Sequence, residues 1–209
     1  MEIKVNSYLK VTAASFAALC FSTNATAQQT ISWSEGTIFT FAEYDGWKKE
    51  IGRSTVIVKE KTETGYKLLD NYGGQDTTVN VSMAGVYSRP KPRTAESFEY
   101  APVKLPIEKG SVWDWTYYYI GKDTGMPGTT NRKCEAETME DIEVPAGKFK
   151  AWKITCRGSW QNMAGSNGTN NRTMWFSPEL SLVVKTDERS SYFGGSDRTI
   201  FQLESIGKQ

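Results

Sequence analysis

Apolar and polar residues alternate with a period of two along most of this chain. From Gln28 onward, short segments rich in β-branched and aromatic residues are separated by glycine, asparagine, aspartate and serine, and no long stretch has the period of a helix. The pattern predicts strands near residues 37–43, 54–61, 66–70, 77–83, 85–89, 111–120, 133–144, 148–157, 171–176, 182–186 and 198–206. We expect a polar link over 90–97 and hairpin tips over 121–131 and 165–171. The fold class predicted is all-β, with antiparallel strands.

The clearest local signal is a hairpin whose turn is predicted over Pro145 to Lys148, because Gly147 can take a positive φ without steric cost. The segment before the turn alternates, with apolar side chains at one parity and acidic side chains at the other. After the turn the apolar positions change parity between Ala151 and Trp152. One extra residue would restore a continuous apolar face, so we expect a bulge near Lys150.

The first 27 residues have the pattern of a secretory signal peptide. A polar start with two lysines precedes a short apolar run from Val11 to Phe21, and small residues lead to a predicted cleavage after Ala27. The run is too short for a stable transmembrane anchor. A lipoprotein interpretation centred on Cys20 is weaker, because Leu19 precedes it where lipidation sites carry a small residue. We therefore expect a periplasmic or secreted bacterial protein.

Length and charge narrow the range of partners. The formal net charge of the 209 residues is +1, and removal of the signal peptide takes away one acid and two lysines, which leaves a neutral chain. A neutral chain has no bulk electrostatic reason to bind nucleic acid or an acidic membrane surface. No second hydrophobic segment approaches the length of a transmembrane span. Residues 28–209 are expected to form a single β domain.

Two cysteines, Cys134 and Cys156, follow the predicted cleavage site. In an oxidising compartment an even count predicts a disulfide, and two buried free thiols are the alternative. A regular two-residue turn at Ala146-Gly147 would place Cys134 opposite Ser159, three residues from its partner, which is too far for a bridge. Either the hairpin is irregular or the bridge reaches a neighbouring strand.

Histidine is absent from the sequence, which excludes Ser-His-Asp and Cys-His catalysis and removes the usual nitrogen ligands of zinc and copper. There is no CxxC motif and no phosphate-binding glycine loop before a helix. We expect no cofactor, no metal and no enzymatic activity. One carboxylate cluster leaves a glycosidase-like acid and base open, although a solvated strand face with lysine partners explains it better; its members are Glu135, Glu137, Glu140, Asp141 and Glu143.

Aromatic residues are the most numerous candidates for a binding site, with seven tryptophans and ten tyrosines. On the strand predicted at 111–120, one face carries Trp113, Trp115, Tyr117 and Tyr119. Such a stripe either fills a core, which is the commoner outcome, or lines a concave site for an apolar or carbohydrate ligand. These four residues are our candidate ligand contacts.

Two segments of the chain have a weakly similar sequence pattern. Residues 35–41 and 109–115 each place a glycine turn before an aromatic strand. Two β-meanders, over 28–100 and 101–209, would together form one strongly curved sheet or an incomplete barrel. Chance similarity between two ordinary strand starts is the alternative.

Three motifs in the second half carry a resemblance. They are the PVKLP segment at 102–106 followed by GSVW at 110–113, VPAGKF at 144–149, and WFSPEL at 175–180. On these motifs, residues 100 to 190 resemble an uncharacterised family of exported bacterial antiparallel-β proteins. The resemblance implies a half-barrel or clam-shaped sheet and no established activity. Ser181 follows the last motif where glycine is usual, so that turn is expected to differ.

Three functions from different classes are left open by the sequence. The first is a non-enzymatic exported protein that binds a small molecule on an aromatic-lined concave face. The second is a structural or interaction subunit of the cell envelope that pairs with a protein partner through exposed strand edges. A hydrolase acting through carboxylates is the third and the weakest.

Overall fold

The structure is a computed structural model and describes residues 29–72, 74–94, 96–121 and 124–209. The predicted signal peptide lies outside these residues. The described chain contains no helix, and therefore none that could cross a membrane. Its strands are β1 (Thr37–Asp45), β2 (Glu50–Lys61), β3 (Gly65–Tyr72), β4 (Gln75–Ser82), β5 (Tyr87–Pro90), β6 (Ser97–Tyr100), β7 (Val112–Ile120), β8 (Pro127–Val144), β9 (Gly147–Asn162), β10 (Asn167–Ser177), β11 (Leu182–Tyr192) and β12 (Gly195–Lys208).

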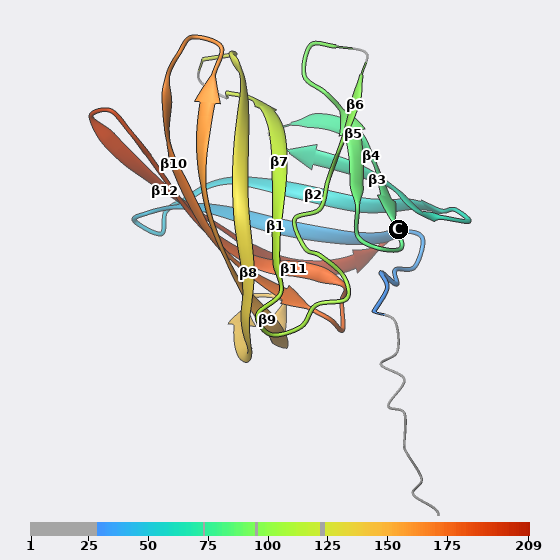
Figure 1. Cartoon of the computed structure of the whole chain (residues 1–209). Helices are drawn as coiled ribbons and strands as arrows, with labels where there is room; N and C mark the ends of the chain where they lie inside the picture. The colour runs from blue at the N-terminus through green and yellow to red at the C-terminus, as the bar shows by residue number, and fades with distance from the viewer. Residues whose placement is uncertain (1–28, 73, 95, 122–123) are drawn as a thin grey trace, which may run out of the picture.

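All twelve strands belong to one antiparallel sheet in the order β6-β5-β4-β3-β2-β1-β12-β11-β10-β9-β8-β7. Each half of the chain forms a meander of six consecutive strands, and the pairing of β1 with β12 joins the two halves. Figure 1 shows β1 and β2 running crosswise to β7 and β8, so that the sheet curls around an interior. The expected all-β, strongly curved, incomplete barrel is confirmed.

The barrel has one unsealed seam, between the edge strands β6 and β7. Aromatic side chains bridge this seam where backbone hydrogen bonds join the other neighbouring strands. Phe98 of β6 packs against Tyr117 and Tyr118 of β7, with ring centroids 5.6 and 5.0 Å apart, and Tyr100 stacks on Trp115 at 5.9 Å. The two strand edges thus face each other, and packing of rings holds them together.

Each predicted strand segment overlaps an observed strand, but several predicted ends are wrong. β8 begins at Pro127 and β10 at Asn167, so the second parts of both predicted hairpin tips belong to strands. β6 was missed altogether, because its four residues follow a polar link and their burial depends on contacts across the seam. The proposed relation between the two halves stays a prediction.

The hairpin of β8 and β9 carries the disulfide Cys134–Cys156, whose Cα atoms lie 4.0 Å apart as direct cross-strand partners. The predicted register placed Cys134 opposite Ser159, three residues away from Cys156, and two differences in the hairpin account for these three residues. The turn is centred on Pro145 and Ala146, so Val144 pairs with Gly147, one position earlier than expected, which shifts every pair by two. A bulge at Glu137, instead of the one expected near Lys150, supplies the remaining residue.

Two clusters of apolar side chains fill the core of the interior. Segments outside the strands help to close it: Ile31 and Trp33 come from the N-terminal segment, and Val103 and Ile107 come from the connection between β6 and β7. The Trp33 indole donates a hydrogen bond of 2.8 Å to the carbonyl of Leu180, which belongs to the third motif. The motifs behind the resemblance therefore lie at positions that close this end of the sheet.

Ser181 keeps a left-handed conformation, with φ of 50°, at the place where we expected a different turn. Only glycine adopts this region without steric cost. The Ser181 side chain is buried, and its hydroxyl lies 3.4 Å from the Thr30 carbonyl, so a polar contact to the N-terminal segment accompanies the strained backbone. The expected difference from the turn of the similar proteins stays a prediction.

Candidate functional site

The interior changes chemistry along the strands. On β8, β9 and β10, inward-facing residues pair directly across the strands and form successive levels. Counted away from the β8–β9 turn, the levels are Ala136 with Ile154 and Met174, then Cys134 with Cys156 and Arg172, then Arg132 with Gly158 and Asn170. We call the apolar part, formed by the two core clusters, the floor. We call the upper part, which begins with Arg132 and Arg172, the mouth. The candidate site is the mouth.

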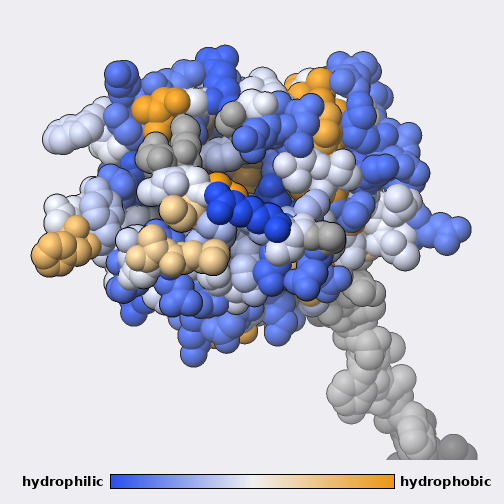
Figure 2. Space-filling model, turned by 90° about the horizontal axis from the view of Figure 1, so that it is seen from above, coloured by the Kyte–Doolittle hydropathy of each residue, from blue (hydrophilic) through white to orange (hydrophobic). Residues whose placement is uncertain are grey.

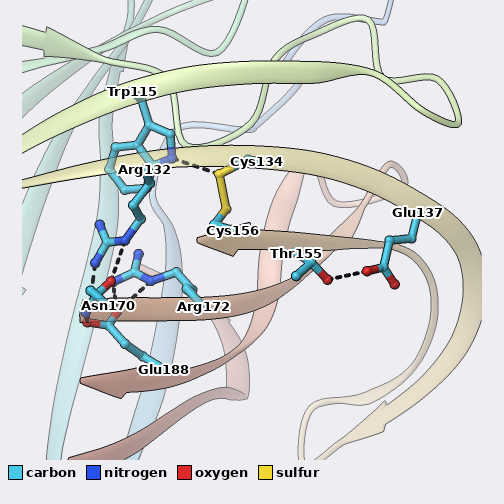
Figure 3. The surroundings of a disulfide bond; sticks show 9 residues. All are labelled: Trp115, Arg132, Cys134, Glu137, Thr155, Cys156, Asn170, Arg172 and Glu188. Atoms are coloured by element: carbon cyan, nitrogen blue, oxygen red, sulfur yellow. Dashed lines mark hydrogen bonds and ion pairs between the residues drawn. A yellow bond between two sulfur atoms is a disulfide. The ribbon is translucent and has the colours of Figure 1, made fainter. Parts of the chain in front are cut away.

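Two arginines in the mouth share a single carboxylate (Figure 3). Arg132 of β8 donates from Nε to Asn170 Oδ1 at 2.6 Å and lies 3.3 Å from Glu188 Oε1 of β11. Arg172 of β10 donates from Nε to Glu188 Oε2 at 2.6 Å, and its Nη2 contacts the same oxygen. Asn170 adds a hydrogen bond of 2.6 Å from its amide nitrogen to Glu188 Oε1. We call these four residues the arginine cluster.

Positive charge exceeds negative charge within the arginine cluster. Burial acts first to raise the pKa of Glu188, but Arg172 and Arg132 outweigh it and hold this pKa below its ordinary value. Burial also lowers the pKa of Arg132, and the like charge of Arg172 lowers it further, whereas Glu188 opposes both. Two guanidiniums and one carboxylate leave one positive charge without a matching negative charge.

Trp115 connects the arginine cluster to the disulfide. Its ring lies 4.9 Å from the guanidinium carbon of Arg132 and 5.8 Å from that of Arg172, within the range of cation–π attraction. Its indole nitrogen donates to the Cys134 sulfur at 3.1 Å. Gly158 lies between Arg132 and Asn170, and a Cβ there would lie 2.0 Å from the Asn131 carbonyl oxygen and 3.0 Å from Arg132 Cγ, so only glycine fits beside this strand and the arginine stem. The aromatic ring and the missing side chain together fix the position of Arg132.

A second polar group lies on the facing wall of the mouth. Arg89 of β5 donates to the Tyr117 hydroxyl across the seam at 2.8 Å and pairs with Asp70 of β3 at 3.6 Å. Tyr72 of β3 donates to Glu43 of β1 at 3.4 Å. Burial raises the pKa of Tyr72, and Glu43 raises it further. Glu188 and Tyr117 also raise it, which places both walls of the mouth within electrostatic reach of each other.

Water reaches the mouth although its charged side chains point inward. Side-chain exposure is 19% for Glu188 and 23% for Arg172, and on the facing wall it is 19% for Arg89 and 24% for Asp70. Arg132 lies deeper, with 4%. Figure 2, which views the molecule from above, shows a recess near the middle of this face, with hydrophilic side chains on part of its rim and hydrophobic side chains on the rest. The mouth is therefore open to solvent from this end.

The structure places the four candidate aromatics at successive depths. Trp113 belongs to the floor, where its buried indole nitrogen has no hydrogen-bond partner among the described residues. Trp115 stands at the boundary, and Tyr117 and Tyr119 line the mouth half-buried. The ring of Tyr119 covers Gly128, where any Cβ would collide with it. Their role as ligand contacts stays a prediction.

Sequence reasoning missed the charged residues of the mouth. A usable signal existed: Arg132 shares the parity of Cys134, and Arg172 and Glu188 share the parities of the apolar positions on their own strands. The strands predicted at 133–144 and 182–186 stop short of Arg132 and Glu188, because the apolar alternation stops there. Arg172 lies inside the strand predicted at 171–176, but its inward orientation was not recognised. Charged side chains at inward positions beyond an apolar run are the feature to look for.

The acidic cluster of β8 has the surface character expected of a solvated face. Lys148 pairs with Glu143 at 3.6 Å and Lys153 with Glu137 at 3.0 Å, and Glu137 also accepts a hydrogen bond of 2.6 Å from Thr155. These contacts are on the exposed side of the hairpin. Within the described ranges, no group of three or more acidic or cysteine side chains is arranged to hold a metal ion.

A shallow pocket of about 230 Å³ lies on the outer face of β9, β10 and β11. Its lining includes Arg157, Asn171 and Arg189, which alternate with the inward residues of the same strands. Cys156 and Arg172, whose side chains belong to the interior, also contribute to its lining, so the pocket lies across the sheet from the mouth.

Comparison with solved structures finds the same fold at low sequence identity. A protein of Bacteroides fragilis NCTC 9343, with a name that describes it as exported and of YmcC-like fold, aligns with a TM-score of 0.58 and 15% identity over 87% of this chain and 100% of its own. A protein of Parabacteroides distasonis ATCC 8503, named as a lipoprotein, aligns with a TM-score of 0.54 and 16% identity over 85% and 97%. These similarities show the fold alone. Comparisons with protein families and with curated proteins give no match.

Proposed function

We propose that this protein is an exported, non-enzymatic binding protein that holds a small ligand in the mouth. The observation that carries the proposal is the continuation of the aromatic stripe past the floor: Tyr117 packs on the edge of the second apolar cluster, and Tyr119 lies beyond it, both half-buried beside the partly exposed Arg172 and Glu188. A stripe that served only the core would end where the apolar clusters end. Aromatic rings with polar edges suit an apolar or a carbohydrate ligand.

Export is proposed from three features taken together. The first 27 residues have the pattern of a signal peptide, and a disulfide suits an oxidising compartment. Two solved proteins of the same fold carry names that describe an exported protein and a lipoprotein. Membership of the exported β-protein family that the three motifs resemble is part of the same proposal.

The ligand is tested by native mass spectrometry of protein purified from its own host, with a solvent extract of the same sample. We expect a retained small molecule in the wild type and its loss in Tyr117→Ala. Trp47→Ala is the matched control, because this aromatic residue is 92% exposed in the β1–β2 turn, far from any interior contact. Preparations that never retain a molecule would contradict the proposal.

A subunit of the cell envelope is the second candidate, and one observation favours it. Three hairpin tips carry fully exposed hydrophobic side chains: Trp47 at 92%, Met163 at 80% and Phe193 at 104%. Exposed tips of this kind suit a protein partner. Crosslinking in the host followed by pull-down separates the candidates, because a subunit yields one dominant protein whose recovery falls when Phe193 is replaced by serine.

A further inference from the structure

The two arginines of the cluster have hydrogen-bonding capacity that the protein does not use. Arg132 and Arg172 direct Nε and Nη2 to Asn170 and Glu188, and the Nη1 atom of each donates to no described residue. Charged groups at this depth are normally paired, because burial without a partner is costly. An unmatched guanidinium with free donors, among side chains that water partly reaches, has the chemistry of an anion site.

We infer that the ligand carries an oxyanion, such as a carboxylate, and that Arg132 and Arg172 bind it. This inference rests on the proposed function and names the chemical class of its ligand. The Trp115 ring is buried between Tyr100 and the arginines, so the rings left for the rest of the molecule are those of Tyr117 and Tyr119, which are half-buried on the same strand. The ligand class is therefore an apolar chain or a sugar ring that bears a negative charge.

Glu188 occupies part of the site in the protein without ligand. Its two oxygens accept from both arginines, so it competes with an incoming anion for the same donors. Asp70 is already paired with Arg89, and Glu43 accepts from Tyr72, so neither neutralises the arginine cluster. Removal of the Glu188 charge should strengthen anion binding, whereas removal of an arginine charge should weaken it.

The experiment measures binding by titration calorimetry with the purified full-length chain and two matched pairs of probes. Decanoate against 1-decanol represents a lipid-like source, and glucuronate against glucose represents a sugar-like source. We expect one anionic probe to bind about tenfold more tightly than its neutral counterpart, the effect of one charge-assisted hydrogen bond. The pair that shows the preference identifies the source.

Variants with opposite expected signs make the result specific. Arg172→Gln should abolish the preference for the anion, and Glu188→Gln should tighten anion binding about tenfold while leaving the neutral probe unchanged. A role limited to stability would move both variants in the same direction. Arg157→Gln, which removes the same charge from the exposed outer face of β9, should behave as the wild type.

Three results overturn the inference: equal binding of anionic and neutral probes, shifts of the same sign in both variants, or no binding of either anion at about 1 mM, the weak end of specific affinity. If the host extract contains a retained neutral molecule, the inference fails while the proposed function stands. If the extract is empty and no probe binds, both fail.

Discussion

Along β9, Ile154 is completely buried among apolar side chains in the floor, whereas Gly158, two inward positions higher, lies between Arg132 and Asn170 in the mouth. The same strands therefore supply both regions, and the same hydrogen-bonded ladder passes through them. In the floor, burial of apolar area stabilises the sheet. In the mouth, charged groups lose contacts with water and gain contacts with one another, so their net contribution to the free energy of folding is small.

The residues of the two regions therefore differ in how much they contribute to stability and to binding. Floor residues hold the halves of the sheet together, and their replacement should lower the free energy of unfolding. Mouth residues contribute less to the free energy of folding than their number of contacts suggests. Their side chains can therefore serve ligand binding at little cost in stability.

Replacement of Ile154 by alanine should destabilise the protein by about 2 to 5 kcal/mol, because the floor cannot fully collapse around the lost volume. Chemical denaturation with tryptophan fluorescence measures the change. Ile51→Ala, the same substitution at a position 44% exposed, should cost less than about 1 kcal/mol. Equal costs at the two positions would show that the floor is not the stabilising region.

The disulfide stands at the boundary, and its removal should have the next largest effect. Cys134→Ala combined with Cys156→Ala should cost about 3 kcal/mol, because the bond closes a loop of 22 residues in the unfolded chain. The denaturation midpoint of the wild type should fall to the same value in a reducing agent. A midpoint insensitive to reduction would mean that the hairpin register alone fixes this boundary.

In the mouth, Glu188→Gln should destabilise by about 2 kcal/mol, because two guanidiniums lose the carboxylate to which they donate. Glu143→Gln, at a surface pair with both partners more than 70% exposed, should have an effect below about 0.5 kcal/mol. A negligible cost for Glu188→Gln would show that the arginines are solvated independently of this carboxylate.

The same variant carries a pH dependence with a definite sign. The pKa of Glu188 in the folded protein lies below its ordinary value of 4.5, so its ionised form stabilises the fold above that pH. The stabilisation is lost as the pH falls through the lowered pKa. The difference between wild type and Glu188→Gln should therefore be constant near neutral pH and shrink below pH 4.5. A difference that grows on acidification would contradict the assigned sign.

At the seam, Tyr117→Phe should cost about 1 kcal/mol through loss of the hydrogen bond from Arg89, while the ring keeps its packing against Phe98. Hydrogen exchange should accelerate at β7 amides and remain slow at β9. Tyr192→Phe, whose hydroxyl is exposed at a hairpin tip, should leave both unchanged. Uniform acceleration across the sheet would show that the seam supports the entire barrel.

Alternation of apolar residues was sufficient to predict the fold class, since the floor is built from such positions. The disulfide between Cys134 and Cys156 is also confirmed, although its register depended on a turn one residue earlier and a bulge at Glu137. Neither has a strong local signature: Pro145-Ala146 and Ala146-Gly147 are both plausible turn centres in the sequence. The bulge becomes necessary only when two cysteines must face each other.

The mouth was predicted only in part, through Tyr117 and Tyr119. Arg132, Arg172 and Glu188 come from three strands, and their mutual distances depend on the register of each strand with its neighbour. The parity of each residue on its own strand can be read from the sequence, but the distances between residues on different strands cannot. An arginine beyond the end of an apolar run looks like the solvent-exposed end of a strand, and only the curl of the sheet turns it inward.

Every hydrogen-bonded strand pair in the sheet except one joins strands that follow each other along the chain, and the exception is β1 with β12. Thr37 pairs with Lys208. A chain that emerges N-terminus first, from a ribosome or through a membrane pore, can therefore cover one edge of β1 early but must leave the other edge open until β12 follows. An unpaired apolar edge invites aggregation. The free edge of β1 is thus exposed until β12 has been made, and β12 then protects it.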